Sequence, residues 1–438
     1  MYRKRKRIYA VAMFIIIAAA ILLQSINLNN DERVTKPYTE DENIVMTQQD
    51  AAPYAIESRY QLGNAHVGAL YARDNQKDNM VEPDVNGDGT FAMYQNPLDS
   101  ETEKEIDDII SDMTLEEKVG QMFFIKNDGR FKSDIIANYP VGGIILFDGD
   151  LKGKSAKNLT DNIASFQSAS KYPLLIGVDE EGGTVIRLSK YSTYAAEPFS
   201  SPRTIYNSGG MEAVNADTAK KSELLLSYGI NVNFAPVCDV SGDSSDFIYS
   251  RSISGDADVV SDFAAQTVAA MKDENIGSVL KHFPGYGSNG DTHTDVVRDT
   301  RDYSTFESVD FKPFQAGIEA GADCILINHN IVECMDSEKP ASLSYNVHKV
   351  LRTELGFKGV IITDDLMMNG VSEFEDEASS AVSAVLAGND MILSTYYDIQ
   401  YQAVLDAVRD GRISEERVET SVRRILRWKY TIGIIPDM

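Results

Sequence analysis

Two groups of residues capable of chemistry flank a glycine-rich stretch in the segment KHFPGYGSNGDTHTD. Lys281 and His282 precede the glycines, and Asp291 and His293 follow them in an Asp-x-His arrangement. Histidine and carboxylate side chains can transfer protons or bind a metal ion, whereas lysine supplies a positive charge. The chain has only five histidines among 438 residues, so two in one segment indicate a functional site. The chemistry depends on the elements that position them.

Short apolar runs alternate with amphipathic stretches from about Glu101 onward. The eight runs are GQMFFI, VGGIILF, LLIGVDE, INVNFAPVCDV, SVLKHFPG, CILINHN, GVIITDD and MILST. Buried parallel strands form continuous apolar segments of this kind, and the helices between them are the crossovers. Thr114 followed by Glu117 is a capping-box pattern that predicts a helix start, and SEERVETSVRRILRWKY predicts an amphipathic helix near the C-terminus.

Eight such β/α units predict an α/β fold, a TIM-type (β/α)8 barrel that forms a single catalytic domain over residues 101–438. A doubly wound open sheet is the main alternative. That fold usually has a glycine-rich phosphate-binding turn after its first strand, and no such turn follows GQMFFI. We therefore expect the barrel, with its active site at the carboxyl ends of the strands.

Polar residues follow five consecutive runs, where that site would lie. They are Asp179, Glu180, Glu181 and Arg187 at and after the end of the third run, Asp239 and Arg251 at and after the end of the fourth, Lys281, His282, Asp291 and His293 in and after the fifth, Asn328 and His329 at the end of the sixth, and Asp364 and Asp365 at the end of the seventh. Parallel strands in a barrel bring these positions to one rim. The pattern therefore predicts an active site.

Several of these residues also have structural interpretations. Asp239 would cap the next helix, Lys281 would form a structural ion pair, and His329 would be a hydrogen-bonded core histidine. Glu180 and Glu181 would hold the following glycine turn by salt bridges. The sequence leaves these alternatives open.

A metal site is a further alternative, because Asp291, His293 and the Asp364–Asp365 pair are all able to bind zinc or manganese. The strand-end lysine and the two arginines oppose a cation electrostatically and suit a hydroxyl-rich ligand better. We therefore expect neither a metal ion nor a cofactor. One of the two adjacent aspartates is expected to be functional, since burying two like charges is unfavourable.

The ordered motifs VDEEGG, FAPVCDV, KHFPGYG, DTHTD and GVIITDDLMM resemble those of glycoside hydrolase family 3 enzymes of the β-N-acetylhexosaminidase type. The resemblance extends from about Asp107 to Ile434. One departure is visible: the family's fifth-strand motif often ends in His-Gly, where this chain has Tyr286 and Gly287. The reactive histidine of the family belongs to the later Asp-x-His, so the departure leaves the acid–base pair in place.

The resemblance implies a retaining mechanism with three catalytic residues. Asp364 would be the nucleophile, His293 the acid–base residue, and Asp291 the partner that orients His293. The implied sugar-binding residues are Asp179, Arg187, Arg251, Lys281 and His282. The implied substrate is a glycan with terminal β-linked N-acetylglucosamine, commonly a peptidoglycan fragment.

Three other functions compete with this one. A β-glucosidase of the same family is disfavoured, since those enzymes generally need a second domain for the acid and few residues follow the eighth run. A glycoside phosphorylase is the second, because a neutral histidine repels phosphate less than a carboxylate does. A non-catalytic, membrane-anchored wall-binding protein would be favoured only if Asp364 or His293 were replaced.

The N-terminal region predicts export. RKRKR precedes sixteen uncharged residues, Ile8 to Leu23, so residues 1–24 are expected to be a signal or anchor, without a small-residue cleavage site. Residues 25–100 are polar and predict a poorly ordered spacer. We expect a single membrane anchor with the catalytic domain outside, or secretion if the signal is cleaved. The formal net charge of −26 argues against a nucleic-acid partner.

Overall fold

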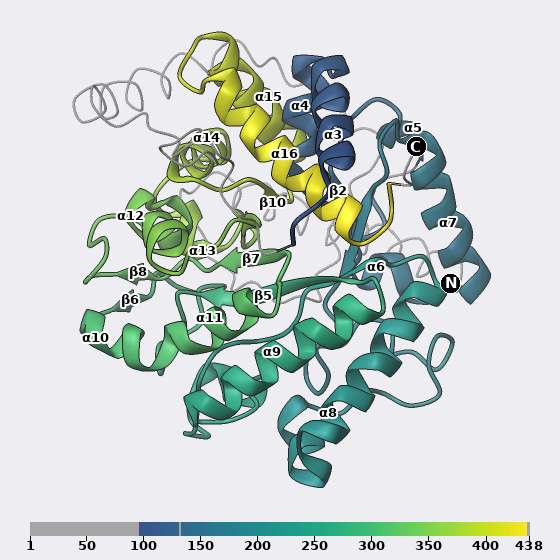
Figure 1. The fold of residues 1–438 in the computed structure, drawn as a ribbon. Coiled ribbons are helices and arrows are strands. Elements are labelled where there is room, and N and C mark those ends of the chain that lie inside the picture. Colours follow the sequence, from purple (N-terminus) through teal and green to yellow (C-terminus); the bar gives the residue numbers. More distant parts are fainter. Residues whose placement is uncertain (1–95, 131–132, 436–438) are drawn as a thin grey trace, which may run out of the picture. The chain divides into compact units, whose positions relative to one another are not determined.

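The computed structural model describes residues 96–130 and 133–435 (Figure 1). The expected anchor, residues 1–24, and most of the expected spacer lie outside the described residues. Within the described ranges, no helix has both the length and the apolar character needed to cross a membrane. The first described contact with the barrel is made by Asn96, whose Nδ2 donates to the carbonyl of Gly321 at 2.9 Å.

Eight parallel strands form one sheet, and each corresponds to one of the eight predicted runs. The strands are β1 (Phe123–Lys126), β2 (Gly143–Ile145), β3 (Leu175–Val178), β4 (Val232–Asn233), β5 (Gly277–Phe283), β7 (Cys324–Ile327), β9 (Val360–Thr363) and β10 (Ile392–Ser394). Their order in the sheet is β10-β1-β2-β3-β4-β5-β7-β9. A bridge between Ile362 and Met391 links the two ends of this order. The barrel prediction is therefore confirmed as a nearly closed, eight-stranded parallel barrel.

Helices connect successive strands. They are α3 (Ser100–Asp112) and α4 (Leu115–Gln121) before β1, α5 (Ser133–Ile136), α6 (Asp148–Leu151), α7 (Ala156–Ala169), α8 (Pro202–Ser227), α9 (Ala257–Asp273), α10 (Tyr303–Thr305), α11 (Phe311–Glu319), α12 (Tyr345–Lys349), α13 (Asn369–Ser372), α14 (Glu377–Ala387), α15 (Tyr397–Arg409) and α16 (Glu415–Thr431). The described crossover between β1 and β2 contains only the four-residue α5. This crossover is much shorter than a regular β/α unit.

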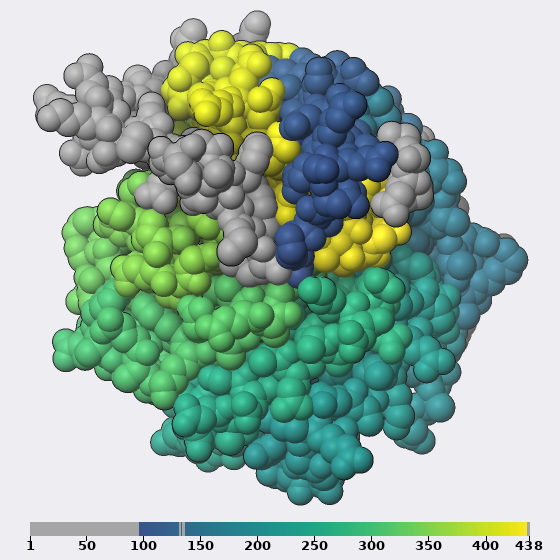
Figure 2. Space-filling view, viewed as in Figure 1, coloured from purple at the N-terminus to yellow at the C-terminus, as the bar shows by residue number. Residues whose placement is uncertain are grey.

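The two predicted helix boundaries follow from side-chain caps. Thr114 and Glu117 form a reciprocal capping box at the start of α4, and the Ser414 side chain accepts the backbone N–H of Arg417 at the start of α16. Helices α3 and α4 lie beside α16, and their surfaces adjoin in Figure 2. An ion pair of 2.6 Å between Lys118 and Glu419 joins α4 to α16. The last helix thus packs against the first two.

The barrel strands are buried on both faces, as expected for parallel strands covered by helices. The rings of Phe124 and Phe234 meet edge to face at 5.2 Å. Gly177 in β3 leaves space for them, because a Cβ at this position would lie 2.6 Å from the Phe234 ring. The glycine inside the apolar run LLIGVDE is therefore a packing requirement of the core.

A two-stranded sheet fixes the end of the long segment that follows β5. Strand β6 (Arg298–Asp299) pairs with β8 (Ile331–Val332). Arg301 donates to the Gly285 carbonyl at 3.2 Å, to Asp310 at 2.9 Å and to Asp299 at 3.0 Å. Both ends of the segment that carries the Asp-x-His motif are therefore held in place.

Candidate active site

The cationic and acidic residues predicted to bind sugar come together at the carboxyl ends of β3 and β5. The Nζ of Lys281 lies 2.7 Å from Asp179 Oδ1 and 2.6 Å from Glu181 Oε1. An Nη of Arg187 lies 3.6 Å from the second oxygen of Asp179. These side chains are largely buried, so their charges interact with little screening by water. Lys281 therefore forms the structural ion pair and also lies within the predicted sugar-binding cluster.

Arg251 and His282 extend this cluster. Arg251 forms two hydrogen bonds with the Glu181 carboxylate, at 2.9 and 2.7 Å, and its Nη2 lies 2.9 Å from His282 Nε2. A guanidinium group can only donate, so His282 Nε2 is the acceptor and Nδ1 carries the hydrogen. Nδ1 then donates to Asp239 Oδ2 at 2.7 Å. Burial lowers the pKa of His282, in agreement with a neutral ring.

Asp239 is therefore part of the site rather than a helix cap. Its carboxylate also accepts the backbone N–H groups of His282 at 3.2 Å and Tyr286 at 2.8 Å. The N-cap of the next helix, α9, is Asp256. Asp239 orients the imidazole of His282 and fixes the start of the glycine-rich segment at the same time.

The two glutamates of VDEEGG have different tasks. Glu180 accepts the backbone N–H groups of Arg187 at 2.9 Å and Leu188 at 2.8 Å, so it shapes the loop that carries Arg187. Glu181 pairs with Arg251 and Lys281 instead. Burial alone would raise the pKa of Glu181, but these two cations hold it well below its usual range. Glu181 was among the polar residues at the predicted rim but not in the predicted sugar-binding set, and it holds two cations of that set, Arg251 and Lys281.

The Asp291–His293 pair lies on the segment after β5. His293 Nδ1 is 2.7 Å from Asp291 Oδ1, and its backbone N–H donates to the same oxygen at 2.9 Å. Burial lowers the pKa of His293, but Asp291 and the charge of Asp364 outweigh burial and raise it above its ordinary value of 6.5. Burial would raise the pKa of Asp291, but the contact with His293 outweighs burial and lowers the pKa below its usual value. The pair therefore favours an imidazolium beside a carboxylate.

Asp364 and Asp365 follow β9 and differ in their contacts. Asp365 accepts from the Thr395 hydroxyl at 2.5 Å and from the Met367 N–H at 3.1 Å, so it stabilises the turn. Burial would raise the pKa of Asp364, but electrostatic interactions with the surrounding imidazoles, of which His329 is the strongest, outweigh burial and lower it below its usual value. Asp364 is thus a buried carboxylate whose ionised form is favoured by the neighbouring histidines, whereas Asp365 is engaged in the turn.

His329 is a hydrogen-bonded core residue. Its Nε2 lies 3.1 Å from the Asp365 carbonyl, which only accepts, so Nε2 carries the hydrogen. Nδ1 then accepts from the Ser342 hydroxyl at 2.7 Å. Burial lowers the pKa of His329. A neutral His329 anchors the turn that begins with Asp364.

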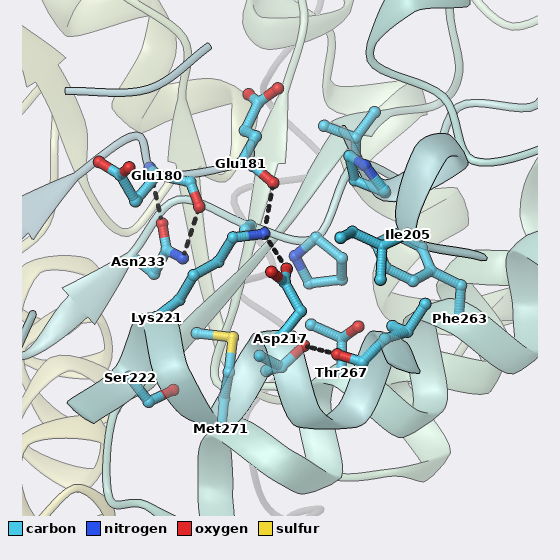
Figure 3. A pocket seen from close by; sticks show the side chains of 16 residues that line it. Glu180, Glu181, Ile205, Asp217, Lys221, Ser222, Asn233, Phe263, Thr267 and Met271 are labelled. Atoms are coloured by element: carbon cyan, nitrogen blue, oxygen red, sulfur yellow. Dashed lines mark hydrogen bonds and ion pairs between the residues drawn. The ribbon is translucent and has the colours of Figure 1, made fainter. Parts of the chain in front are cut away.

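A small cavity lined by both polar and apolar side chains lies next to Glu180 and Glu181 (Figure 3). Lys221 from α8 donates to the Glu181 carbonyl at 2.8 Å and pairs with Asp217 at 2.6 Å. The volume of about 30 Å³ is that of roughly one water molecule. The cavity is too small for a sugar, and it is Lys221 that holds the turn through the Glu181 carbonyl. In the described part of the chain, no three His, Cys, Asp or Glu side chains are grouped as metal ligands would be.

Comparison with known proteins identifies the family of this chain. Residues 114–428 match the family model described as the glycosyl hydrolase family 3 N-terminal domain. β-Hexosaminidase A from Pseudoalteromonas piscicida is 33% identical over 326 residues, which are 68% of this chain and 54% of that protein. The chain therefore spans about half the length of that relative.

Two solved structures have similar folds. A glycoside hydrolase family 3 β-N-acetylglucosaminidase from Paenibacillus sp. str. FPU-7 has a TM-score of 0.68 and 31% identity, covering 74% of this chain and 64% of that chain. A β-glucoside phosphorylase has a TM-score of 0.70 and 21% identity, covering 78% and 63%, and shows the fold alone. The family match, which covers most of the described residues, decides the classification: the chain belongs to glycosyl hydrolase family 3.

Proposed function

We propose that this protein is a retaining β-N-acetylhexosaminidase that removes terminal β-linked N-acetylglucosamine from glycans. The observation that carries the proposal is the Asp291–His293 pair, whose imidazole is in the electrostatic field of Asp364. The cluster of Asp179, Arg187 and Lys281 supports it as a binding site for sugar hydroxyl groups. The similarity to proteins named β-hexosaminidase and β-N-acetylglucosaminidase supports the choice of sugar.

The first chemical step joins Asp364 to the sugar. A carboxylate oxygen of Asp364 forms a bond to the anomeric carbon while the bond from that carbon to the glycosidic oxygen breaks. The leaving oxygen takes a proton from His293. Because Nδ1 of His293 is held by Asp291, Nε2 is the nitrogen that delivers this proton. The product is a covalent glycosyl-enzyme.

The second step reverses these roles. Neutral His293 accepts a proton from water, the water oxygen bonds to the anomeric carbon, and the bond to Asp364 breaks. Two displacements at one carbon retain its configuration. Most retaining glycosidases use a second carboxylic acid with a raised pKa for this task. An imidazole already titrates near neutrality, so it needs only the adjustment that Asp291 supplies.

The sugar-binding cluster combines acceptors and donors. Asp179 can accept two hydroxyl hydrogens, and Arg187, Arg251 and Lys281 provide donors whose positions Asp179 and Glu181 fix. His282, held by Asp239 and Arg251, completes this set. Such a preorganised polar surface binds a sugar ring without rearranging its own ion pairs.

The proposal extends to an exported enzyme that acts on peptidoglycan-derived glycans. The basic segment Arg3–Arg7 followed by the apolar segment Ile8–Leu23 supports an N-terminal anchor with the acidic catalytic domain outside. Protease added to intact cells should release a soluble, active fragment by cutting between about residues 25 and 97. Full protection of the protein until the cells are lysed would contradict this topology.

A trapping experiment tests the chemistry directly. A slow N-acetylglucosaminide with a good leaving group should accumulate as a sugar ester, and peptide mass spectrometry should find it on Asp364. A label on Asp365, whose carboxylate binds Thr395 and Met367, would remove Asp364 from the nucleophile role. A substrate panel that includes β-glucosides and muropeptides should show preference for the terminal N-acetylglucosaminide.

A glycoside phosphorylase is the second candidate. The observation in its favour is the imidazole acid–base group, since the neutral form of His293 repels an incoming phosphate less than a carboxylate would. Adding inorganic phosphate to the assay separates the two functions. Formation of sugar 1-phosphate at the expense of free sugar would favour the phosphorylase.

A further inference from the structure

Thr292, the residue between Asp291 and His293, is fully buried, although the side chains of both neighbours are more than a quarter exposed. Its hydroxyl lies 2.8 Å from the hydroxyl of Tyr286. Its carbonyl accepts the backbone N–H of Gly370 at 3.1 Å. The motif is therefore held in place through its middle residue, while the side chains of Asp291 and His293 remain partly exposed.

Tyr286 is a fixed support for this contact. The side chain is buried, and its ring packs edge-on against His282 and Phe247, with centroids 5.2 and 5.5 Å away. Its backbone N–H donates to Asp239, the carboxylate that also orients His282. Tyr286 is thus held by Asp239, the same carboxylate that orients the proposed sugar-binding residue His282.

Gly370 makes a second contact with Thr292, through its backbone. It lies in α13, on the segment after β9 that begins with Asp364. A Cβ at this glycine would lie 2.9 Å from the Cβ of His329 and 3.3 Å from the Cβ of Thr292. Thr292 therefore contacts both Tyr286, which packs against His282, and the segment that begins with Asp364.

We propose that Tyr286 is a positioning residue whose hydroxyl, by holding Thr292, keeps Asp291 and His293 where they can act together with Asp364. The inference rests on the proposed acid–base role of His293. The stretch Gly287–Gly290 has two glycines and permits many backbone conformations, so contacts outside it must select one. The hydroxyl pair supplies such a contact within a buried environment.

Four substitutions isolate the hydroxyl pair. Tyr286→Phe removes one hydroxyl and keeps the ring against His282 and Phe247. Thr292→Val removes the other with little change of shape, and Thr292→Ser retains it. The double substitution Tyr286→Phe/Thr292→Val should be no worse than the poorer single one, because both remove the same contact.

The kinetic expectation is a loss in kcat rather than in binding. Displacement of His293 by about 1 Å should lower kcat on an unactivated β-N-acetylglucosaminide roughly 10- to 100-fold. KM should change little, since Asp179, Arg251 and Lys281 keep their contacts. Thr292→Ser should retain most of the kcat that Thr292→Val loses. Tyr430→Phe is the matched control, because that hydroxyl contacts Glu105 between α16 and α3, 3.1 Å away.

A second readout does not depend on activity. The chain has five histidines, so NMR can follow the titration of His293 in the unliganded full-length protein. Asp291, Asp364 and Arg251 are the charged groups that set the pKa of His293, which lies above 6.5. In Tyr286→Phe and Thr292→Val, the midpoint should fall toward 6.5 as the contact with Asp291 loosens. In Tyr430→Phe it should match the wild type.

These measurements separate failure of the inference from failure of the proposed function. An active wild-type enzyme with unchanged kcat and His293 midpoint in both variants would show that Tyr286 positions nothing. A wild type inactive on every β-N-acetylhexosaminide would overturn the proposed function, while the titration would still decide the role of Tyr286. If Tyr286→Phe does not fold, the comparison of Thr292→Val with Thr292→Ser decides.

Discussion

One oxygen of Asp291 binds both the ring and the backbone of His293: Oδ1 lies 2.7 Å from Nδ1 and 2.9 Å from the backbone nitrogen. The shared acceptor limits rotation of the imidazole and sets its tautomer. The proton that Nδ1 donates to Asp291 stays in place, so in the proposed mechanism Nε2 is the nitrogen that exchanges a proton with the substrate. Two residues at i and i+2 thereby form a compact acid–base unit.

Replacement of His293 by alanine should affect substrates unequally. A natural sugar leaving group needs the proton, so its first step should slow by roughly 10²–10⁴-fold. A nitrophenolate leaves without it, so that first step should be nearly unchanged while deglycosylation slows. Stopped-flow release of nitrophenol should then show an early burst.

Asp291→Ala serves as the graded comparison, since it keeps the imidazole and removes its orientation. Its losses should be smaller than those of His293→Ala on the same two substrates. Equal losses on both substrates without a burst would mean that His293 only binds sugar.

The dependence of kcat/KM on pH should be bell-shaped for an unactivated substrate. The acidic limb follows Asp364, whose pKa is lowered, so activity is lost only at a pH below the ordinary aspartate value of 3.8. The alkaline limb follows His293, whose raised pKa keeps the acid form above pH 6.5. Asp291→Asn removes the negative partner, so the alkaline limb should move to lower pH. If the alkaline limb does not move, it belongs to a group other than His293.

Glu181→Gln should destabilise the fold and weaken substrate binding. It removes the buried negative charge between Arg251 and Lys281, which then repel each other. Loss of one partner in a buried ion cluster costs about 3–5 kcal/mol. Glu333→Gln is the control, because its 3.5 Å pair with Arg298 is exposed and is worth at most ~1 kcal/mol. Urea denaturation of both variants measures the difference.

Gly370→Ala should displace the catalytic segment. The added methyl group would meet the Cβ atoms of His329 and Thr292 at 2.9 and 3.3 Å. Overpacking of this kind costs roughly 1–3 kcal/mol, and the shift of Thr292 should also lower kcat. Gly290→Ala, in the segment after β5 that carries Thr292, is the control, since the nearest atom to its added Cβ is 3.8 Å away. Equal kcat values for the two variants would contradict the packing account.

Lys429 should make folding stability rise with pH. Burial lowers the pKa of its amine from 10.5 to about 7, and Gln121 accepts its hydrogen bond at 2.7 Å. Between these pH values the unfolded chain binds a proton that the folded chain does not, so the free energy of unfolding increases with pH. Lys429→Met should remove this slope and stabilise the fold near pH 6, on the order of 2–4 kcal/mol. The exposed Lys157→Met should leave the slope unchanged.

The sequence alone determined the barrel and the rim on which the site lies. Each apolar run became a strand, because a strand buried on both faces must be apolar along its length. Residues at the ends of the runs, such as Asp179 and Asp364, directly follow strands β3 and β9 and lie at one rim because parallel strands end on the same side. The capping box at Thr114 also marked its helix, since a cap depends on neighbours three residues away.

The tertiary structure decided which of these residues are partners. Asp239 contacts His282 across 43 positions, and Glu181 contacts Arg251 across 70. Nothing local distinguishes Glu181 from Glu180, and the contact between Tyr286 and Thr292 depends on how the segment folds back on itself. Ion pairing and pKa shifts depend on distance and burial in three dimensions, and these arise only when the strands and loops are packed together.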